Sequence, residues 1–136
     1  MLHEEITSKI IKAFYTVYNT LGYGFLEKVY ENALVHELAK QGLNVGQQIP
    51  IQVYYDGMIV GEYFADLLVE GCVILELKAA ECISDQNEAQ LLNYLRATHV
   101  EVGLILNFGP EAKFSRKIFT LDRKEGSRIR NRFDLN

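Results

Sequence analysis

The sequence predicts a single α/β domain of the α+β kind, in which a mixed central sheet is flanked by helices. The chain has 136 residues, 49% of them hydrophobic, which suits one domain with a core and is too short for two. The spacing of its apolar residues gives the element order α, α, β, β, β, α, β, β. No apolar run of about 18 residues occurs, and no basic segment precedes an apolar one, so we expect a cytoplasmic protein that does not contact the membrane.

Two helices are expected before the first strand. Residues 6–21 carry apolar side chains at helical spacing, and Gly22 ends that pattern. Residues 26–38 carry a second apolar stripe, which stops at Gly42. The second helix therefore has Glu27 in its first turn.

The middle of the chain predicts three antiparallel strands. From residue 45 the apolar period changes to two, and strands are expected near 45–55, 59–69 and 73–79. The Asp56-Gly57 pair between the first two strands is typical of a tight hairpin turn.

A third helix and two more strands complete the predicted domain. Ser84 is a suitable N-cap for a helix of about four turns, with acids in its first turn. The apolar segment 100–109 and the segment 114–121 are then expected as strands. We therefore expect residues 1–122 to form one domain.

Residues 123–136 are expected to be a basic tail. Residues 1–112 carry six Lys or Arg against fifteen Asp or Glu, whereas residues 113–136 carry eight against three. A basic tail on an acidic body can hold a polyanion near acidic chemistry, although a solvated terminus explains the same numbers equally well. The candidate nucleic-acid-binding residues are Arg123, Lys124, Arg128, Arg130 and Arg132.

Charged residues interrupt the two strands on either side of the predicted turn at 70–72. Because side chains alternate along a strand, Glu76 and Lys78 point to the same face. A three-residue turn places Asp66 directly opposite Glu76. A two-residue turn places Asp66 opposite Leu75 and sends Glu76 to the far face.

Two carboxylates that face each other on neighbouring strands repel, and burying one without a partner is costly. A divalent cation removes that cost, and Mg²⁺ favours one or two carboxylates together with water and phosphate oxygens. A nearby lysine can orient a nucleophile or stabilise developing negative charge, so the set predicts phosphodiester hydrolysis. The alternative is a solvent-facing sheet edge with an ordinary Glu76–Lys78 ion pair, which the E-x-K pattern alone favours.

The segment ADLLVEGCVILELK, residues 65–78, follows a helix and a hairpin and precedes a helix and a strand. In this arrangement it resembles the PD-(D/E)XK nuclease superfamily, whose restriction-endonuclease-like core is αβββαβ. The resemblance covers residues 25–107 and leaves the first helix as an N-terminal addition. Ala65 stands where the motif's name has proline. The motif's acid, acid and lysine fall on Asp66, Glu76 and Lys78.

Further positions follow from the resemblance. GFLEKVY, residues 24–30, is similar to the GxxExxY signature of one small family of the superfamily. The resemblance implies that Glu27 joins Asp66 and Glu76 as a metal ligand. The Leu77 carbonyl is a further candidate ligand, because Leu77 lies between Glu76 and Lys78. An acid in a first helical turn is also favourable with the helix dipole alone.

Gln90 and Tyr94 lie four residues apart on one face of the third predicted helix. QLLNY resembles the QxxxY motif of the RecB-like and lambda-exonuclease-like branch, where the pair helps to organise substrate and active site. The alternative is an exposed Gln beside a half-buried Tyr.

The resemblance implies a nuclease that depends on Mg²⁺, with Mn²⁺ able to substitute, and that acts on nucleic acid, DNA being favoured over RNA. A homodimer and a separate helicase are candidate partners. Iron–sulfur nucleases of this branch use four cysteines, and Cys72 and Cys82 are the only two here, so no cluster is expected. Two rival hypotheses are a catalytically silent module that binds nucleic acid or protein, and a different phosphate chemistry.

Overall fold

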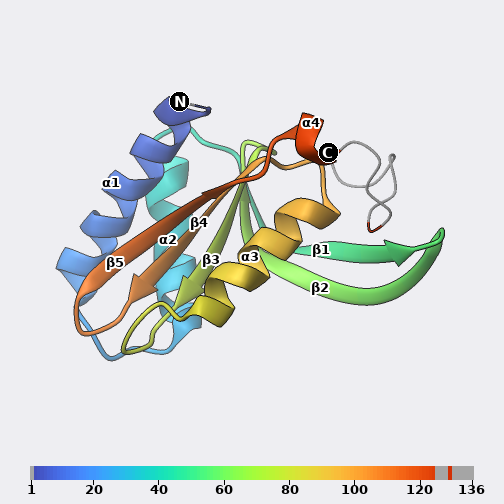
Figure 1. The fold of residues 1–136 in the computed structure, drawn as a ribbon. Helices are drawn as coiled ribbons and strands as arrows, with labels where there is room; N and C mark the ends of the chain where they lie inside the picture. Colours follow the sequence, from blue (N-terminus) through green and yellow to red (C-terminus); the bar gives the residue numbers. More distant parts are fainter. Residues whose placement is uncertain (1, 125–128, 130–136) are drawn as a thin grey trace.

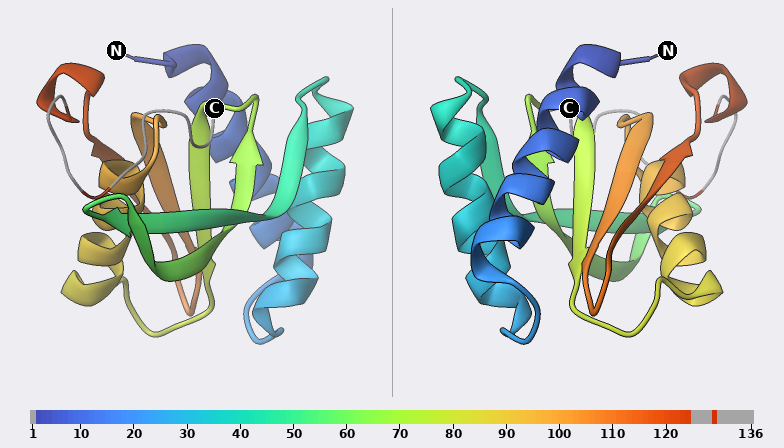
Figure 2. Two further views of the ribbon diagram at one scale, coloured as in Figure 1. Left: turned by 90° about the vertical axis from the view of Figure 1, so that its right-hand side faces the viewer. Right: turned by 90° about the vertical axis from the view of Figure 1, so that its left-hand side faces the viewer.

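The computed structural model describes residues 2–124 and residue 129. A five-stranded sheet lies between two helical layers (Figure 1). Helices α1 (Glu4–Leu21) and α2 (Glu27–Lys40) cover one face, and α3 (Asp85–Ala97) covers the other, as Figure 2 shows. The predicted α+β architecture with a restriction-endonuclease-like arrangement is confirmed.

The sheet is mixed and follows the chain order. Its strands are β1 (Val45–Tyr55), β2 (Met58–Val69), β3 (Val73–Lys78), β4 (Val102–Phe108) and β5 (Ala112–Ile118). Neighbours are antiparallel except β3 and β4, which are parallel and joined through α3. Each observed strand begins or ends close to its predicted position because the period-two pattern and the Gly-containing turns mark its limits.

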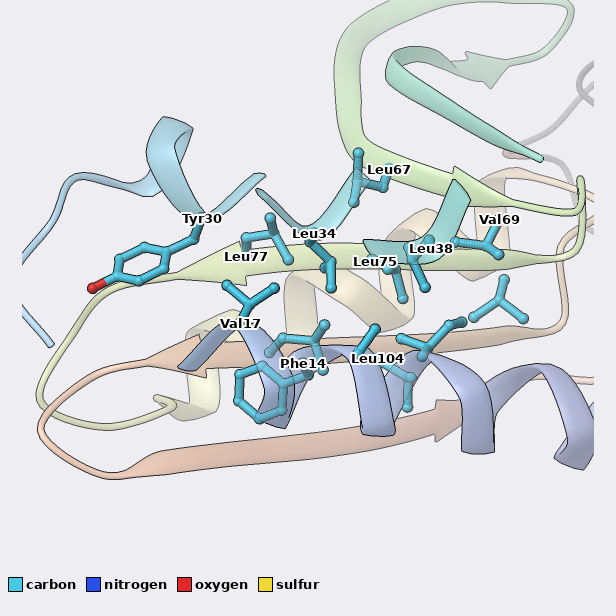
Figure 3. Close-up of a cluster of buried hydrophobic side chains, with 14 of the residues drawn as sticks. Phe14, Val17, Tyr30, Leu34, Leu38, Leu67, Val69, Leu75, Leu77 and Leu104 are labelled. Carbon is cyan, nitrogen blue, oxygen red and sulfur yellow. The ribbon is translucent and has the colours of Figure 1, made fainter. Parts of the chain in front are cut away.

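The core between the α1–α2 layer and the sheet is apolar and fully buried (Figure 3). Phe14 and Val17 come from α1, and Leu34 comes from α2. They meet alternate residues of the sheet, such as Leu75 on β3 and Leu104 on β4. This burial fixes α2, and with it the helix's first turn, against the central strands.

Helix α3 packs closely on the opposite face. Its N-cap is the predicted one: the Ser84 hydroxyl accepts a hydrogen bond from the Asn87 backbone N–H at 3.0 Å, and the Asn87 side chain accepts from the Ser84 N–H at 3.1 Å. Gly103 on β4 lies beneath the helix, where an added Cβ would come within 2.6 Å of Leu91 Cδ1. The glycine therefore permits the close approach of α3 to the sheet.

The long β1–β2 hairpin curls toward the α3 side of the molecule (Figure 2). Its turn contains Asp56 at φ 52° and Gly57 at φ 79°, which fits the predicted tight turn. Ile51 and Ala65 from this hairpin pack into the cluster around α3. The hairpin therefore leaves β3 partway along its length, and that departure creates the site described next.

The described C-terminal residues form a short helix, α4 (Leu121–Lys124), that the sequence did not predict. It crosses residue 122, where we placed the end of the domain. No helix in the described part of the chain is long and apolar enough to cross a membrane.

Candidate active site

The turn between β2 and β3 sets the register on which the site depends. Glu70 at φ 53° and Gly71 at φ 66° turn the chain, and Val69 pairs with Val73. This is the predicted three-residue turn. Cross-strand pairing continues to Leu67 and Leu75 and ends there, one residue before the two acids.

Beyond that last pair, two carboxylates replace the backbone ladder. The Asp66 N–H donates to Glu76 Oε2 at 3.0 Å, and the Leu77 N–H donates to Asp66 Oδ2 at 2.8 Å. The acids thus bridge the opening where β2 parts from β3. Their backbone bonds hold both side chains in fixed positions on the same side.

The environment of the two acids disfavours having both charged. Glu76 is only 9% exposed. Burial and the neighbouring Asp66 charge raise the pKa of Glu76 to about 8, and the more distant Glu27 charge acts in the same direction. Burial also raises the pKa of Asp66, against the lowering effect of the Leu77 hydrogen bond. The repulsion expected from the sequence is therefore present.

Lys78 follows Glu76 on the same side of β3. It is half-buried, and its positive charge lowers the pKa of both Asp66 and Glu76. Within the described residues, Lys78 and Glu76 do not form the ordinary ion pair that the alternative interpretation required. The charge of Lys78 therefore lowers the pKa of the two acids from a distance, without a direct ion pair.

Glu27 reaches the end of β3 from the first turn of α2. Its Oε2 atom accepts a hydrogen bond from the Ala79 N–H at 3.2 Å. The buried Tyr30 fixes the loop before this turn, because its hydroxyl donates to the Gly22 carbonyl at 2.6 Å and accepts from the Phe25 N–H at 3.1 Å. The Tyr30 ring stacks on Phe108 at 4.3 Å between centroids.

The GxxExxY pattern thus has a physical explanation in this chain. Gly24 adopts φ +122°, a conformation that L side chains rarely adopt, Glu27 meets the strand end, and Tyr30 fastens the loop to the core.

Gln90 and Tyr94 form a direct contact on α3. The Gln90 side-chain amide donates to the Tyr94 hydroxyl at 3.1 Å. Burial raises the pKa of Tyr94, and the charges of Glu76 and Asp66 add to that rise. The Tyr94 ring also lies 5.7 Å from that of Tyr63 on β2. The pair therefore lies beside the two acids.

Two further polar residues, which sequence reasoning missed, lie beside Asp66: Gln48 donates a hydrogen bond to it, and the charge of Glu31 raises its pKa. Glu31 on α2 is 4% exposed and binds the Lys28 ammonium at 3.1 Å. The Gln48 amide donates to Glu31 Oε1 at 3.2 Å and to Asp66 Oδ1 at 3.5 Å. Gln48 does so from a left-handed conformation at φ 52°, which is unusual for a residue other than glycine.

Only part of this arrangement has a signal in the sequence. Glu31 lies one helical turn after Glu27, so the spacing placed both acids on one face of the helix. Nothing in the sequence marks the backbone conformation of Gln48.

A second missed feature locks the segment after β3. The Asn107 side chain accepts from the Ala80 N–H and donates to the Ala80 carbonyl, both at 3.0 Å. An added Cβ on Gly109 would meet the same carbonyl at 2.0 Å. The sequence does contain a signal for this contact, because Asn107 is a polar residue at the end of an otherwise apolar strand.

The donor set fits a hard divalent cation, although the structure does not assemble all the predicted ligands. Asp66 and Glu76 offer carboxylate oxygens, and Mg²⁺ is commonly bound through one or two such groups with water and phosphate completing its shell. In residues 2–124 and 129, no three His, Cys, Asp or Glu side chains gather closely enough to hold an ion. Glu27 is thus close to the pair without joining it.

The tail prediction fails at Lys124. Lys124 is 1% exposed, and its ammonium donates to the Thr98 carbonyl at 2.9 Å and to the Val100 carbonyl. It anchors α4 and is not positioned to contact phosphate. Arg123 stacks over the Phe119 ring at 4.9 Å. Arg128, Arg130 and Arg132 lie outside the described residues.

Comparison with known proteins gives one match. A sequence profile described as the PD-(D/E)XK nuclease superfamily matches residues 4–118, most of the chain. No curated protein and no solved structure matches. Because the matched span covers α1, α2, α3, the acid pair and Lys78, the chain belongs to the PD-(D/E)XK nuclease superfamily.

Proposed function

We propose that this protein is a metal-dependent nuclease that hydrolyses phosphodiester bonds, with DNA as substrate and Mg²⁺ as cofactor, for which Mn²⁺ can substitute. The observation that carries the proposal is the acid pair: Asp66 and Glu76 are fixed side by side by backbone N–H groups although their charges repel. A structural role would favour an ion pair there, whereas a cation site explains the arrangement.

Each residue of the site has a distinct proposed role. Asp66, Glu76 and the Leu77 carbonyl would hold the ion, and Glu27 would reach it through water or by leaving Ala79. When bound, the ion polarises the phosphoryl group and lowers the pKa of a water molecule. Lys78 orients the attacking water and stabilises the negative charge that develops on the phosphate.

The contacts of α3 and α2 give the remaining roles. Gln90 holds the Tyr94 hydroxyl, and the pair positions the substrate backbone beside the acids. The loop geometry around Tyr30 supports membership of the small GxxExxY family, since each of the three signature residues has a distinct task at the site.

A cleavage assay tests the proposal. Labelled single- and double-stranded DNA and RNA are incubated with the protein in Mg²⁺, in Mn²⁺ and in EDTA. We expect metal-dependent cleavage of DNA, and Lys78→Ala is expected to lower its rate by about 100-fold or more. Lys113→Ala, at an exposed ion pair on β5, is the matched control and should cleave like the parent.

The second candidate function is a silent module that binds nucleic acid or protein. The separation of Glu27 from the acid pair favours it, because its carboxylate already binds Ala79. Metal-independent binding without cleavage in the same assay would select this function. The homodimer, the helicase partner and the cytoplasmic location stay predictions.

A further inference from the structure

The loop that joins α1 to α2 exposes an unusual group of large apolar side chains. Tyr23 is 58% exposed, Phe25 48% and Leu26 82%. Single exposed apolar residues are ordinary, but three within four positions form a patch of the kind that marks a binding surface.

The patch is held rigidly. The Tyr30 hydroxyl bridges the Gly22 carbonyl and the Phe25 N–H, and the Tyr30 ring is packed on Phe108. The Phe25 ring meets Tyr30 edge-on at 6.1 Å. A surface that is ordered before binding loses little conformational entropy when a ligand arrives.

The same loop borders a hollow at the end of β3. Residues 23–28 and Ala79 line this hollow, which has a volume of about 500 Å³. Such a volume lies in the range of roughly 300–1,000 Å³ that accepts small ligands. Glu27 is part of its wall and binds Ala79, the first residue after β3, so the hollow lies beside the end of the strand that carries Glu76.

The lining combines flat rings with a cation. Lys28 lies in the hollow's wall with its side chain 61% exposed, so it can approach a phosphate while it stays near Glu31. An unstacked nucleotide offers a π-face for a ring and a phosphate for an ammonium. Base pairs inside a duplex do not expose their faces, whereas a single strand or a frayed end does.

We propose that Tyr23 and Phe25 form a stacking site for one unpaired base of the strand whose phosphodiester lies at Asp66 and Glu76. This inference rests on the proposed nuclease function and narrows its substrate class to single-stranded or frayed nucleic acid. The loop residues bind and orient the strand, and they take no part in the chemical step.

The test measures binding without cleavage. In a Lys78→Ala background, fluorescence anisotropy follows a labelled oligothymidine and a labelled blunt duplex. We expect the Tyr23→Ala/Phe25→Ala pair to bind the single strand roughly 5- to 150-fold more weakly, the equivalent of about 1–3 kcal/mol for one stacked base. Duplex affinity should change less than about twofold, because a blunt duplex offers the rings no free base to stack.

Matched variants separate stacking from general damage. Tyr55→Ala/Phe114→Ala removes one exposed Tyr and one exposed Phe elsewhere and should bind like the parent. Tyr23→Phe should retain affinity because the ring remains. The parent should bind an oligonucleotide with abasic sites more weakly than oligothymidine. The loop variant should bind the two oligonucleotides with equal affinity.

The outcomes distinguish failure of the stacking site from failure of the proposed nuclease function. If the parent binds the single strand and the loop variant binds it equally well, the stacking site is wrong and the nuclease function stands. If the parent binds no nucleic acid, both fail. If the loop variant changes only self-association in sedimentation, the patch is an interface between copies and the stacking site is overturned.

Discussion

Glu76 makes the stability of the metal-free protein depend on pH. Its pKa is about 8 in the fold against an ordinary value of 4.5. Between these values the folded state keeps a proton that the unfolded chain has released, so the free energy of unfolding falls as pH rises. Each unit of pKa difference corresponds to about 1.4 kcal/mol.

Urea unfolding in EDTA at several pH values between about 4.5 and 8 measures this fall. Glu76→Gln should flatten the profile, whereas Glu111→Gln, at an exposed acid, should leave it unchanged. An equal slope in the parent and in Glu76→Gln would show that another group causes the dependence.

Asp66→Asn separates a metal ligand from a structural acid. Asn keeps an oxygen that can accept from the Leu77 N–H but removes the charge that repels Glu76. The variant is expected to be as stable as the parent, or more stable, in EDTA, and to lose most of the stabilisation that Mg²⁺ gives the parent. Thermal melts with and without Mg²⁺ check this. A clear drop in EDTA with an undiminished Mg²⁺ response would make Asp66 structural.

Gln48 offers a test of positioning. Gln48→Gly removes the left-handed strain together with the amide that joins Glu31 to Asp66. We expect little loss of stability but a lower kcat with KM unchanged, measured on the best substrate of the cleavage assay. Gln52→Gly on the same strand is the control, and a higher KM with kcat unchanged would contradict a positioning role, because it would mean that Gln48 acts in substrate binding.

At the scale of elements, the entry into α2 determines where Glu27 lies. Tyr30→Phe keeps the ring on Phe108 and removes the hydroxyl between Gly22 and Phe25. The loss should lower the free energy of unfolding by about 1–2 kcal/mol, because a partly buried carbonyl and N–H lose their shared partner. Urea unfolding measures it, and the exposed Tyr23→Phe serves as control. A variant as stable as the parent would mean that water replaces the hydroxyl.

The elements also show how far the sequence alone could lead. The β2–β3 register was predictable because strand period and turn length together fix which side chains face each other, and Val69 does pair with Val73. The pairing of Gln90 with Tyr94 followed from helical spacing. The bridge from Gln48 to Asp66 was not predictable, since it depends on a backbone conformation that propensity disfavours.

On the scale of the whole molecule, the error at Lys124 has a clear origin. Charge counting treats every lysine near a terminus as solvated, and only the tertiary packing places this one against Thr98 and Val100. The Ile129 carbonyl likewise accepts from the Tyr54 N–H at 2.7 Å. Lys124 therefore binds the segment between α3 and β4, and Ile129 binds β1.

Truncation tests that conclusion. Ending the chain after residue 122 removes the contacts of Lys124 and Ile129 and should lower the free energy of unfolding by about 2 kcal/mol or more. Ending it after residue 130 keeps Lys124 and the Ile129 peptide carbonyl and should restore most of that loss. Thermal melts of the three chains compare them. Equal stability of the shorter chain would show that these contacts contribute little.

The stacking of Tyr30 on Phe108 has a consequence for synthesis on the ribosome. Every proposed catalytic residue lies between Glu27 and Tyr94. Two residues that hold the site in position are translated later: Phe108 stacks on Tyr30, and Asn107 binds Ala80. A growing chain thus carries the complete set of acids before it can hold them in place. Cleavage by the proposed site is therefore expected only after β4 has emerged from the ribosome and packed against Tyr30 and Ala80.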